Sequence, residues 1–418
     1  MIGLVTLFSE LETAQNIEHW KNGFIGDLLQ EGGIEDKGVY NNRKDLEQMI
    51  NRNGFSALII LIATGGTELF AEFIIKRLSA PILLWSHPDK NSTASALEIT
   101  GAFRGLSSLT SVYGYYKNEK CKNRIRQFIK ICNVINKVSR NVSGFIGSDS
   151  DWLLVSKKTA SNDYLAYTTE ITTGELKDNY KKIKDTDVDL ALEKLEKCID
   201  KGNITDPDLR NAVKVYLALK AICGKYKLSS LTLRCFDLLK EKYTACLALA
   251  MLNDEGIVSG CEGDKHALLS MIIAQALNGR TCWMANPSSL DFEKKEIVFA
   301  HCSVPFKMLD EKETVMYDTH MESGLSVAIA GSLRQEDVTV FRLGDNFNKL
   351  LAVRGKVISK NDFDSRWCRT QARIELNGDL ERWYESSLGN HQIIAYGDMT
   401  EDLRYFCKLM NIEFVGIE

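Results

Sequence analysis

A continuous apolar run constrains the fold of this chain more than any other feature of its sequence. Residues 56–66 read SALIILIATGG, an apolar segment that ends in Thr-Gly-Gly. Such a run is typical of a strand that is buried on both faces of a parallel sheet. Strand and helix patterns alternate around it, with strands expected at 2–8 and 80–87 and helices at 10–32, 43–54 and 67–79. The alternation predicts a doubly wound, Rossmann-like α/β domain over residues 1–140.

The residue pattern of the remaining sequence changes once, near Arg280. Before it, a second Rossmann-like α/β domain is expected over residues 141–285, with long helical patterns at 187–202, 205–226 and 233–256. After it, short runs alternate apolar and polar residues between turn residues, at 281–305, 325–333, 337–344, 349–359, 371–376 and 391–398. That pattern predicts an antiparallel, barrel-like domain of five to seven strands over residues 286–418. A chain of 418 residues is long enough for several hydrophobic cores.

Composition excludes several classes of protein. The net charge of −4 comes from well-mixed charges, whereas nucleic-acid binding needs a basic face. No apolar run reaches the length of a membrane span, and the N-terminal segment lacks the basic start of a signal peptide. The eleven cysteines form no CxxC pair, so reduced thiols in a cytoplasmic protein are expected. A Rossmann fingerprint, a P-loop and a GxSxG elbow are all missing from the sequence.

The segment GCEGDKHALLSMIIAQALNG, residues 260–279, places two carboxylates at the mouth of an apolar helix. Glu262 and Asp264 are two residues apart, and His266, which we expect to face solvent, follows. Acidic groups at this position cap a helix, because they favourably oppose its exposed N–H groups. A carboxylate here can also be presented to a cleft as a metal ligand. The helix alone leaves both interpretations open.

Three of the six histidines lie at strand boundaries in the β-rich region. His301 ends an apolar strand, His320 lies in the segment DTHMESG, and His391 opens a strand. One histidine in such a place is more often structural. Three of them, together with Glu262, indicate a metal site with nitrogen and oxygen donors.

Several motifs follow one another in a fixed order between Ile257 and His391: CEGDKHALLSMIIAQALNG, TCWMAN, FAHCSVP and GNH. This ordered set resembles the superfamily of L-fucose isomerase and L-arabinose isomerase, which are metal-dependent aldose–ketose isomerases. The resemblance agrees with the expected order of two α/β domains and a β-barrel. It implies an intramolecular oxidoreductase of carbohydrate metabolism, with N-terminal domains shorter than those of typical members.

The resemblance also implies a role for each matched residue. Glu262 corresponds to a metal ligand that acts as an acid/base group, and His391 to a second ligand. His301 corresponds to a residue that contacts the metal directly or through a ligand. Aldose–ketose isomerisation moves a proton between C1 and C2 through an enediol, and a divalent cation stabilises the developing oxyanion. Oxygen and imidazole donors suit Mn²⁺, with Mg²⁺ or Co²⁺ as alternatives.

One position departs from the family pattern. Asn286 stands where the fucose isomerase branch has its second metal-binding carboxylate. We expect Asn286 in the catalytic site as a neutral metal ligand, because its amide oxygen can bind a hard cation but cannot act as a general base. The second base must then come from elsewhere, with Glu322 and Asp291 as the nearest candidates.

The substrate is expected to be a free sugar, because no phosphate-binding loop is visible. A 6-deoxyhexose, a pentose and a 6-sulfo-6-deoxyhexose all remain open. The expected substrate-binding residues are His320, Arg369, Gln371, Thr64 and His87. For Thr64 an ordinary tight βα turn is favoured over a contact with the substrate, and Arg369 fits a surface salt bridge equally well.

A sulfonate at C6 would need a cationic partner. The last domain offers five arginines, most of which we expect to be solvated: Arg342, Arg354, Arg366, Arg369 and Arg373. We interpret Cys302 and Cys368 as small apolar residues rather than as nucleophiles. Two alternatives to an isomerase remain, a sugar-binding protein that has lost activity and a related epimerase or lyase, because Asn286 replaces a carboxylate.

A homo-oligomer, either a trimer or a hexamer, is expected as the functional form. The proposed ligands form an open cleft, whereas the reaction requires a site that excludes water. In relatives the N-terminal domain reaches across to a neighbouring subunit. We therefore expect Thr64–Glu68 or His87 of one chain to approach Glu262 of another.

Overall fold

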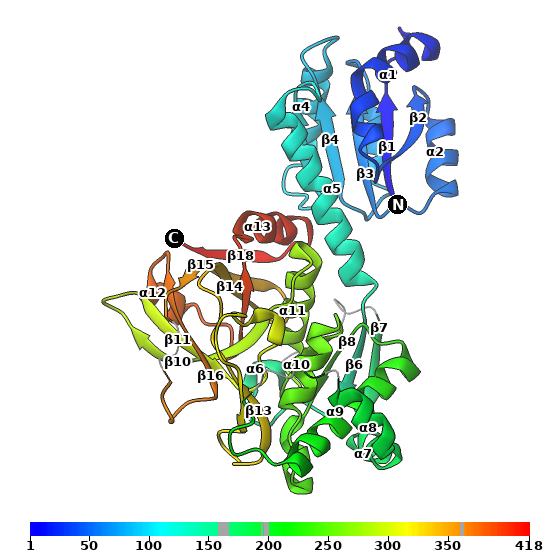
Figure 1. Ribbon diagram of the computed structural model, residues 1–418. Coiled ribbons are helices and arrows are strands. Elements are labelled where there is room, and N and C mark those ends of the chain that lie inside the picture. Colours follow the sequence, from blue (N-terminus) through cyan, green and yellow to red (C-terminus); the bar gives the residue numbers. More distant parts are fainter. Residues whose placement is uncertain (158–166, 194, 196–199, 360–362) are drawn as a thin grey trace. The chain divides into compact units, whose positions relative to one another are not determined.

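The structure is a computed structural model that describes residues 1–157, 167–193, 195, 200–359 and 363–418. The chain divides into two compact units (Figure 1). The first contains residues 1–136 and 405–411, and the second contains residues 137–404 and 412–418. Within the described part of the chain, no helix is both long and apolar enough to cross a membrane.

The first unit is built on a five-stranded parallel sheet with the order β2-β1-β3-β4-β5. Its strands are β1 (Ile2–Leu7), β2 (Glu35–Tyr40), β3 (Ala57–Ile62), β4 (Ile82–Ser86) and β5 (Leu109–Tyr113). Its helices are α1 (Ala14–Gln30), α2 (Arg43–Arg52), α3 (Glu68–Ile75), α4 (Ser92–Ala102) and α5 (Glu119–Ser139), whose end belongs to the second unit. Every residue of β3 is fully buried, which confirms that the apolar run is a strand covered on both faces.

The second unit begins with a four-stranded parallel sheet in the order β7-β6-β8-β9. These strands are β6 (Val142–Ile146), β7 (Tyr167–Ile171), β8 (Ser230–Leu233) and β9 (Val258–Gly260). Its helices are α6 (Leu154–Lys157), α7 (Thr173–Lys182), α8 (Asp185–Leu192), α9 (Asp206–Tyr226), η1 (Cys235–Glu241), α10 (Cys246–Asp254) and α11 (Lys265–Asn278). The parallel sheets confirm the predicted α/β character of this part of the chain.

Two expected helices differ from the structure. The pattern at 233–256 is two helices, η1 and α10, because Lys242 adopts a left-handed conformation with φ of 62° and ends η1. The pattern at 187–202 is helical only to Leu192 in α8, and its residues 194 and 196–199 lie outside the described residues.

The β-rich region forms a closed barrel of six antiparallel strands, as the alternating pattern predicted. The barrel strands are β10 (Trp283–Asp291), β11 (Glu296–His301), β14 (Asp337–Gly344), β15 (Lys349–Val357), β16 (Thr370–Leu376) and β17 (Gln392–Tyr396). Pairing between β14 and β15 closes the ring, and β18 (Glu413–Ile417) joins β15 in parallel. The remaining elements are η2 (Phe306–Met308), α12 (Leu380–Glu385), α13 (Thr400–Leu409) and a separate hairpin of β12 (Met316–Thr319) and β13 (Ser326–Ala330).

The core that holds the second unit together includes apolar side chains from all six barrel strands, among them Trp283, Phe299, Leu351 and Ile394. The same cluster includes Leu247 of α10, so the α/β part and the barrel share one core. Side chains fill a barrel this narrow, which leaves its rim for a binding site. The three-domain division of the chain stays a prediction.

Candidate metal centre

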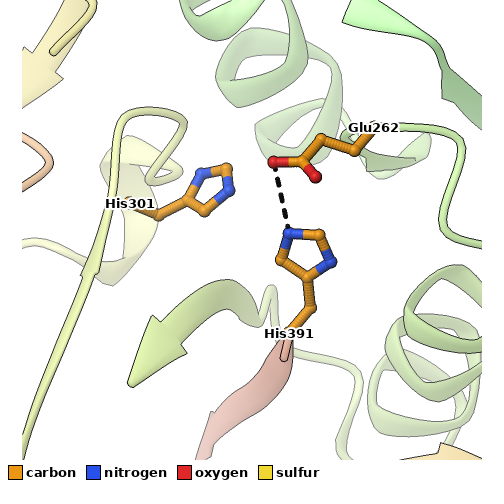
Figure 2. Close-up of side chains that lie close together, drawn as sticks. All are labelled: Glu262, His301 and His391. Atoms are coloured by element: carbon orange, nitrogen blue, oxygen red, sulfur yellow. Dashed lines mark ion pairs between the residues drawn. The ribbon is translucent and has the colours of Figure 1, made fainter. Parts of the chain in front are cut away.

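Three side chains from distant parts of the sequence meet in the second unit. Glu262 lies in the loop between β9 and α11, His301 is the last residue of β11, and His391 directly precedes β17. One ligand atom of each lies within 4.8 Å of the others, and all three residues are buried (Figure 2). The structure thus brings together three of the four expected metal ligands, from the mouth of a helix and the ends of two barrel strands.

The backbone at Glu262 is held in an uncommon conformation. Glu262 has φ of 62° and the following Gly263 has φ of 75°. A Cβ atom at Gly263 would lie 2.6 Å from the carbonyl oxygen of Ser148, so no larger residue fits there without displacing the loop. A positive φ at a residue with a side chain is strained and is a frequent feature of functional sites.

Asp264 fulfils the capping role and also orients His391. Its Oδ1 accepts a hydrogen bond of 2.9 Å from the N–H of Ala267, which caps α11. Its Oδ2 lies 2.8 Å from Nδ1 of His391 and 3.0 Å from Nη1 of Arg342. Asp264, His391 and Arg342 are all almost completely buried. A carboxylate that accepts a hydrogen bond from one ring nitrogen of a histidine fixes the orientation of the ring, so that the other nitrogen can bind a metal.

This arrangement leaves two acceptor atoms facing each other. Because Nδ1 of His391 donates to Asp264, its Nε2 carries the lone pair whenever the ring is neutral. Nε2 lies 3.5 Å from Oε1 of Glu262 and has no hydrogen-bond partner among the described residues. Two buried acceptors in this geometry need a cation or a proton between them. The donor set therefore fits a divalent metal.

When no cation is bound, the two carboxylates favour a proton in its place, between Nε2 of His391 and Oε1 of Glu262. Burial lowers the pKa of His391, but the carboxylates of Asp264 and Glu262 outweigh it and raise that pKa to about 9. Burial and the neighbouring His391 lower the pKa of His301 to about 3, which keeps its ring neutral, as metal binding requires. The hydroxyl of Ser303 lies 2.8 Å from Nδ1 of His301, so Nε2 is the nitrogen left for a ligand.

Asn286 lies on β10 at the same end of the barrel. It pairs with Ala300, which precedes His301, and the adjacent Ala285 pairs with Gln392, which follows His391. Its Oδ1 accepts a hydrogen bond of 3.2 Å from Asn390. Its role as a neutral metal ligand stays a prediction.

The two candidate second bases differ in position. Asp291 pairs with Glu296 at the opposite end of the β10–β11 hairpin from His301 and is bound to Lys294. Glu322 lies in the loop between β12 and β13. Partial burial raises the pKa of Glu322, and the negative charge of Glu262 raises it further, so Glu322 is the candidate that lies close to the site.

The loop that contains Glu322 carries His320 as well. Burial lowers the pKa of His320, the charge of Glu262 opposes that shift, and Arg369 adds to it. Arg369 donates a hydrogen bond of 2.8 Å to the carbonyl of Thr319 and pairs with Asp318. Arg369 therefore holds the start of the loop that carries His320, and the role of both residues in binding the sugar stays a prediction.

The side chain of Gln371 binds the backbone of a neighbouring loop. Its amide group binds the backbone of Asp364 and of Cys368, at 2.7 to 3.1 Å, and therefore holds that loop.

Hydrogen bonding from Cys368 lowers the pKa of the buried Cys302 to about 7.

The expectation that His266 faces solvent was wrong. His266 is fully buried and stacks on Phe347, with ring centroids 4.3 Å apart. Arg342 is also buried, because it pairs with Asp264. Each of the five arginines considered for a sulfonate has a carboxylate partner: Asp264 for Arg342, Asp398 for Arg354, Asp364 for Arg366, Asp318 for Arg369 and Glu296 for Arg373.

Thr64 and His87 belong to the first unit. The hydroxyl of Thr64 accepts a hydrogen bond of 2.8 Å from the N–H of Ser9, and the adjoining Gly65 packs against Asn91, as in a tight βα turn. His87 is fully buried among aromatic rings, including Trp20 at 4.9 Å. Their role in binding the sugar stays a prediction.

Trp152 was not identified from the sequence. It follows β6, and its Nε1 donates a hydrogen bond of 2.5 Å to Oε2 of Glu262. The segment SDSDW at 148–152 lies between a strand and a helix, where loops of parallel sheets often contribute to sites. The position of this segment after a strand was the signal by which Trp152 could have been identified as a site residue.

No protein-family model matches the chain. Several curated relatives are similar to the chain over most of its length. A sulfoquinovose isomerase of Alkalicoccus urumqiensis is 24% identical over 371 residues, which cover 84% of this chain and 83% of the relative. A sulfoquinovose isomerase of Clostridium sp. (strain MSTE9) is 25% identical over 386 residues, covering 85% of each chain. A third, from Priestia megaterium, is 22% identical and covers 82% of each.

The similarity extends over most of both chains. The chain is an aldose–ketose isomerase. This confirms the enzyme class expected from the sequence, an intramolecular oxidoreductase.

Proposed function

We propose that the chain is a metal-dependent isomerase of a free sulfonated hexose, a 6-sulfo-6-deoxyhexose such as sulfoquinovose. The buried cluster of Glu262, His301 and His391, with its two facing acceptor atoms, is the observation that carries the metal dependence. Mixed oxygen and imidazole donors favour Mn²⁺, with Mg²⁺ or Co²⁺ as alternatives. The name of the relatives supports the choice of substrate.

The two glutamates suit opposite roles in proton transfer. Burial raises the pKa of Glu262, but His391 and the Trp152 N–H more than compensate and lower it, so its carboxylate is ionised. The pKa of Glu322 is shifted upward instead. Two carboxyl groups with pKa values driven apart are typical of an acid/base pair. Glu262 would take the proton from C2 of the aldose and return it to C1, while Glu322 would exchange the hydroxyl proton between O1 and O2.

A cation bound by Glu262, His301 and His391 would polarise the oxygens at C1 and C2 of the sugar. Asn286 would add an amide oxygen to this set. The Ser303 hydroxyl and the Asp264 carboxylate would hold the two imidazole rings in place. The homo-oligomer, a trimer or a hexamer, also remains part of the proposal.

Proton exchange with solvent tests the reaction. Sulfoquinovose and its non-sulfonated counterpart, 6-deoxyglucose, would be incubated with the protein and Mn²⁺ in D₂O. An isomerase places deuterium at C1 of the ketose or C2 of the aldose. An epimerase labels only the carbon that it inverts. Absence of any label from both sugars would contradict the proposal.

Metal removal is expected to abolish activity reversibly. Chelator-treated protein should be inactive, and Mn²⁺ should restore turnover. His391→Ala should weaken Mn²⁺ binding by more than the 10- to 100-fold, roughly, that outer partners contribute, because it removes a ligand. Titration calorimetry measures this affinity. His19→Ala, an exposed histidine of the first unit, is the control and should bind Mn²⁺ like the wild type.

Arg369 is expected to select the sulfonated sugar, because its guanidinium is bound to Thr319, the residue next to His320. Arg369→Gln should raise KM about 10-fold for sulfoquinovose and leave it unchanged for 6-deoxyglucose. Arg366→Gln removes an arginine that pairs with Asp364 at the exposed surface and serves as the control. If KM rose equally for both sugars, the role of Arg369 would be only to hold Thr319 in place.

A further inference from the structure

Trp152 combines a hydrogen bond to Glu262 with a half-exposed ring. Its indole N–H donates to Oε2 of Glu262 at 2.5 Å, yet 49% of its surface is exposed. The second oxygen of Glu262, Oε1, is the atom that faces His391. The indole therefore holds one carboxylate oxygen while the other stays directed at the metal centre. A large exposed aromatic ring at this place needs an explanation other than core packing.

The loop that carries Trp152 is fixed to both of its neighbours. Arg234, the residue after β8, donates to Oδ2 of Asp151 at 2.6 Å and to the carbonyl of Asp149 at 2.9 Å. The N–H of Ser150 donates to the carbonyl of Glu262 at 2.9 Å. The position of the indole relative to Glu262 is thus set by backbone and side-chain contacts together.

Aromatic rings and a cavity adjoin the indole. Trp152 meets the edge of Phe236 at a centroid distance of 4.7 Å, and Phe236 meets His320 at 5.6 Å. A cavity of about 320 Å³ is lined by residues 152–156 and by Asn390, which precedes His391. Trp152 lines this cavity and contacts Glu262, so the cavity and the metal centre share one wall.

We propose that Trp152 is a positioning residue for Glu262 and that its exposed ring is the platform on which the sugar lies. The inference rests on the proposed function, since it takes Glu262 as the group that moves the proton. Aromatic rings with one polar edge suit both tasks, because the ring faces the apolar C–H groups of a sugar while the N–H binds a carboxylate. The geometry assigns the first task to the N–H and the second to the ring.

Two substitutions separate the tasks. Trp152→Phe keeps a ring and removes the N–H, so kcat should fall about 10- to 100-fold while KM changes less than about 3-fold. Trp152→Leu removes the ring as well, so KM should rise about a further 10-fold. Phe292→Leu is the matched control, because Phe292 is an exposed ring in a similar edge contact with Tyr384, on the far hairpin of the same unit. It should leave kcat and KM unchanged.

Binding is measured separately from turnover. Titration calorimetry of sulfoquinovose and of Mn²⁺ would be recorded for each variant, with the tryptophan fluorescence of the protein. Sugar addition should change the fluorescence of the wild type and not of Trp152→Phe. Mn²⁺ affinity should stay within about 3-fold, since the N–H is not a ligand.

Opposite results would overturn the inference. A wild-type kcat in Trp152→Phe would remove the positioning role, and unchanged sugar affinity in Trp152→Leu would remove the platform. If the wild-type protein isomerises no sugar but binds sulfoquinovose, the proposed function fails, while the loss of that binding in Trp152→Leu would still support the platform.

Discussion

Replacing Glu262 by Gln is expected to reduce isomerisation by at least about 10³-fold. The amide has the same size but carries no charge, so it cannot accept the proton from C2, and general catalysis alone contributes about 10²–10⁴-fold. It also offers a weaker oxygen to a cation between Glu262 and His391, so Mn²⁺ affinity should fall. A coupled assay of ketose formation and calorimetry with Mn²⁺ measure the two effects.

The control for this variant is Glu241→Gln. Glu241 is an exposed glutamate on η1 that pairs with Lys177 at 2.6 Å, so the same chemical change is made away from the site. Its activity should match the wild type. If Glu262→Gln also retained wild-type turnover, the assignment of the helix mouth as the metal centre would be wrong.

Asp264→Asn is expected to cause the largest loss of stability. The asparagine can still cap α11 through its oxygen, but it removes the buried charge that faces Arg342 and His391. Breaking a buried ion pair leaves an uncompensated charge and typically costs about 3–5 kcal/mol. Urea unfolding followed by circular dichroism would give the free energy of unfolding. The control Asp189→Asn breaks an exposed pair with Arg210 and should cost about 1 kcal/mol or less.

The same carboxylate predicts how stability depends on pH. Burial would raise the pKa of Asp264, but Arg342 and His391 hold it well below its usual range. A depressed pKa contributes stability above the unfolded pKa of about 4 and loses it as pH falls below that value. Wild-type protein should therefore lose more stability than Asp264→Asn between about pH 4 and pH 2. Parallel curves for the two proteins would show that Asp264 is not held ionised.

Local patterns in the sequence were sufficient for most of the elements. The run at Ala57–Ile62 has no polar residue to face water, so it had to be a strand with both faces covered, and all six residues are fully buried. Alternation along 337–344 and 349–359 similarly predicted barrel strands, because a strand with one face in a core has a period of two residues. The pattern failed at 233–256, where η1 ends at a left-handed Lys242 that no hydrophobic periodicity reveals.

The three residues of the buried cluster were also accessible from the sequence. Glu262, His301 and His391 are the residue types that bind divalent cations, and each stands at the end of an element, where a side chain can leave the core. The order of the surrounding motifs added the resemblance to aldose–ketose isomerases. The relatives support that enzyme class.

The partners of the proposed ligands could be identified only from the tertiary structure. Asp264 meets Arg342 across 78 residues of sequence, and Trp152 meets Glu262 across 110. Such contacts depend on the order of strands in the sheet and on the closure of β14 against β15. Local periodicity specifies which face of an element is buried but not which distant element covers it. The sequence thus determined the elements and the ligand types, and the folded chain determined their partners, because burial of a charge depends on neighbours far away along the chain.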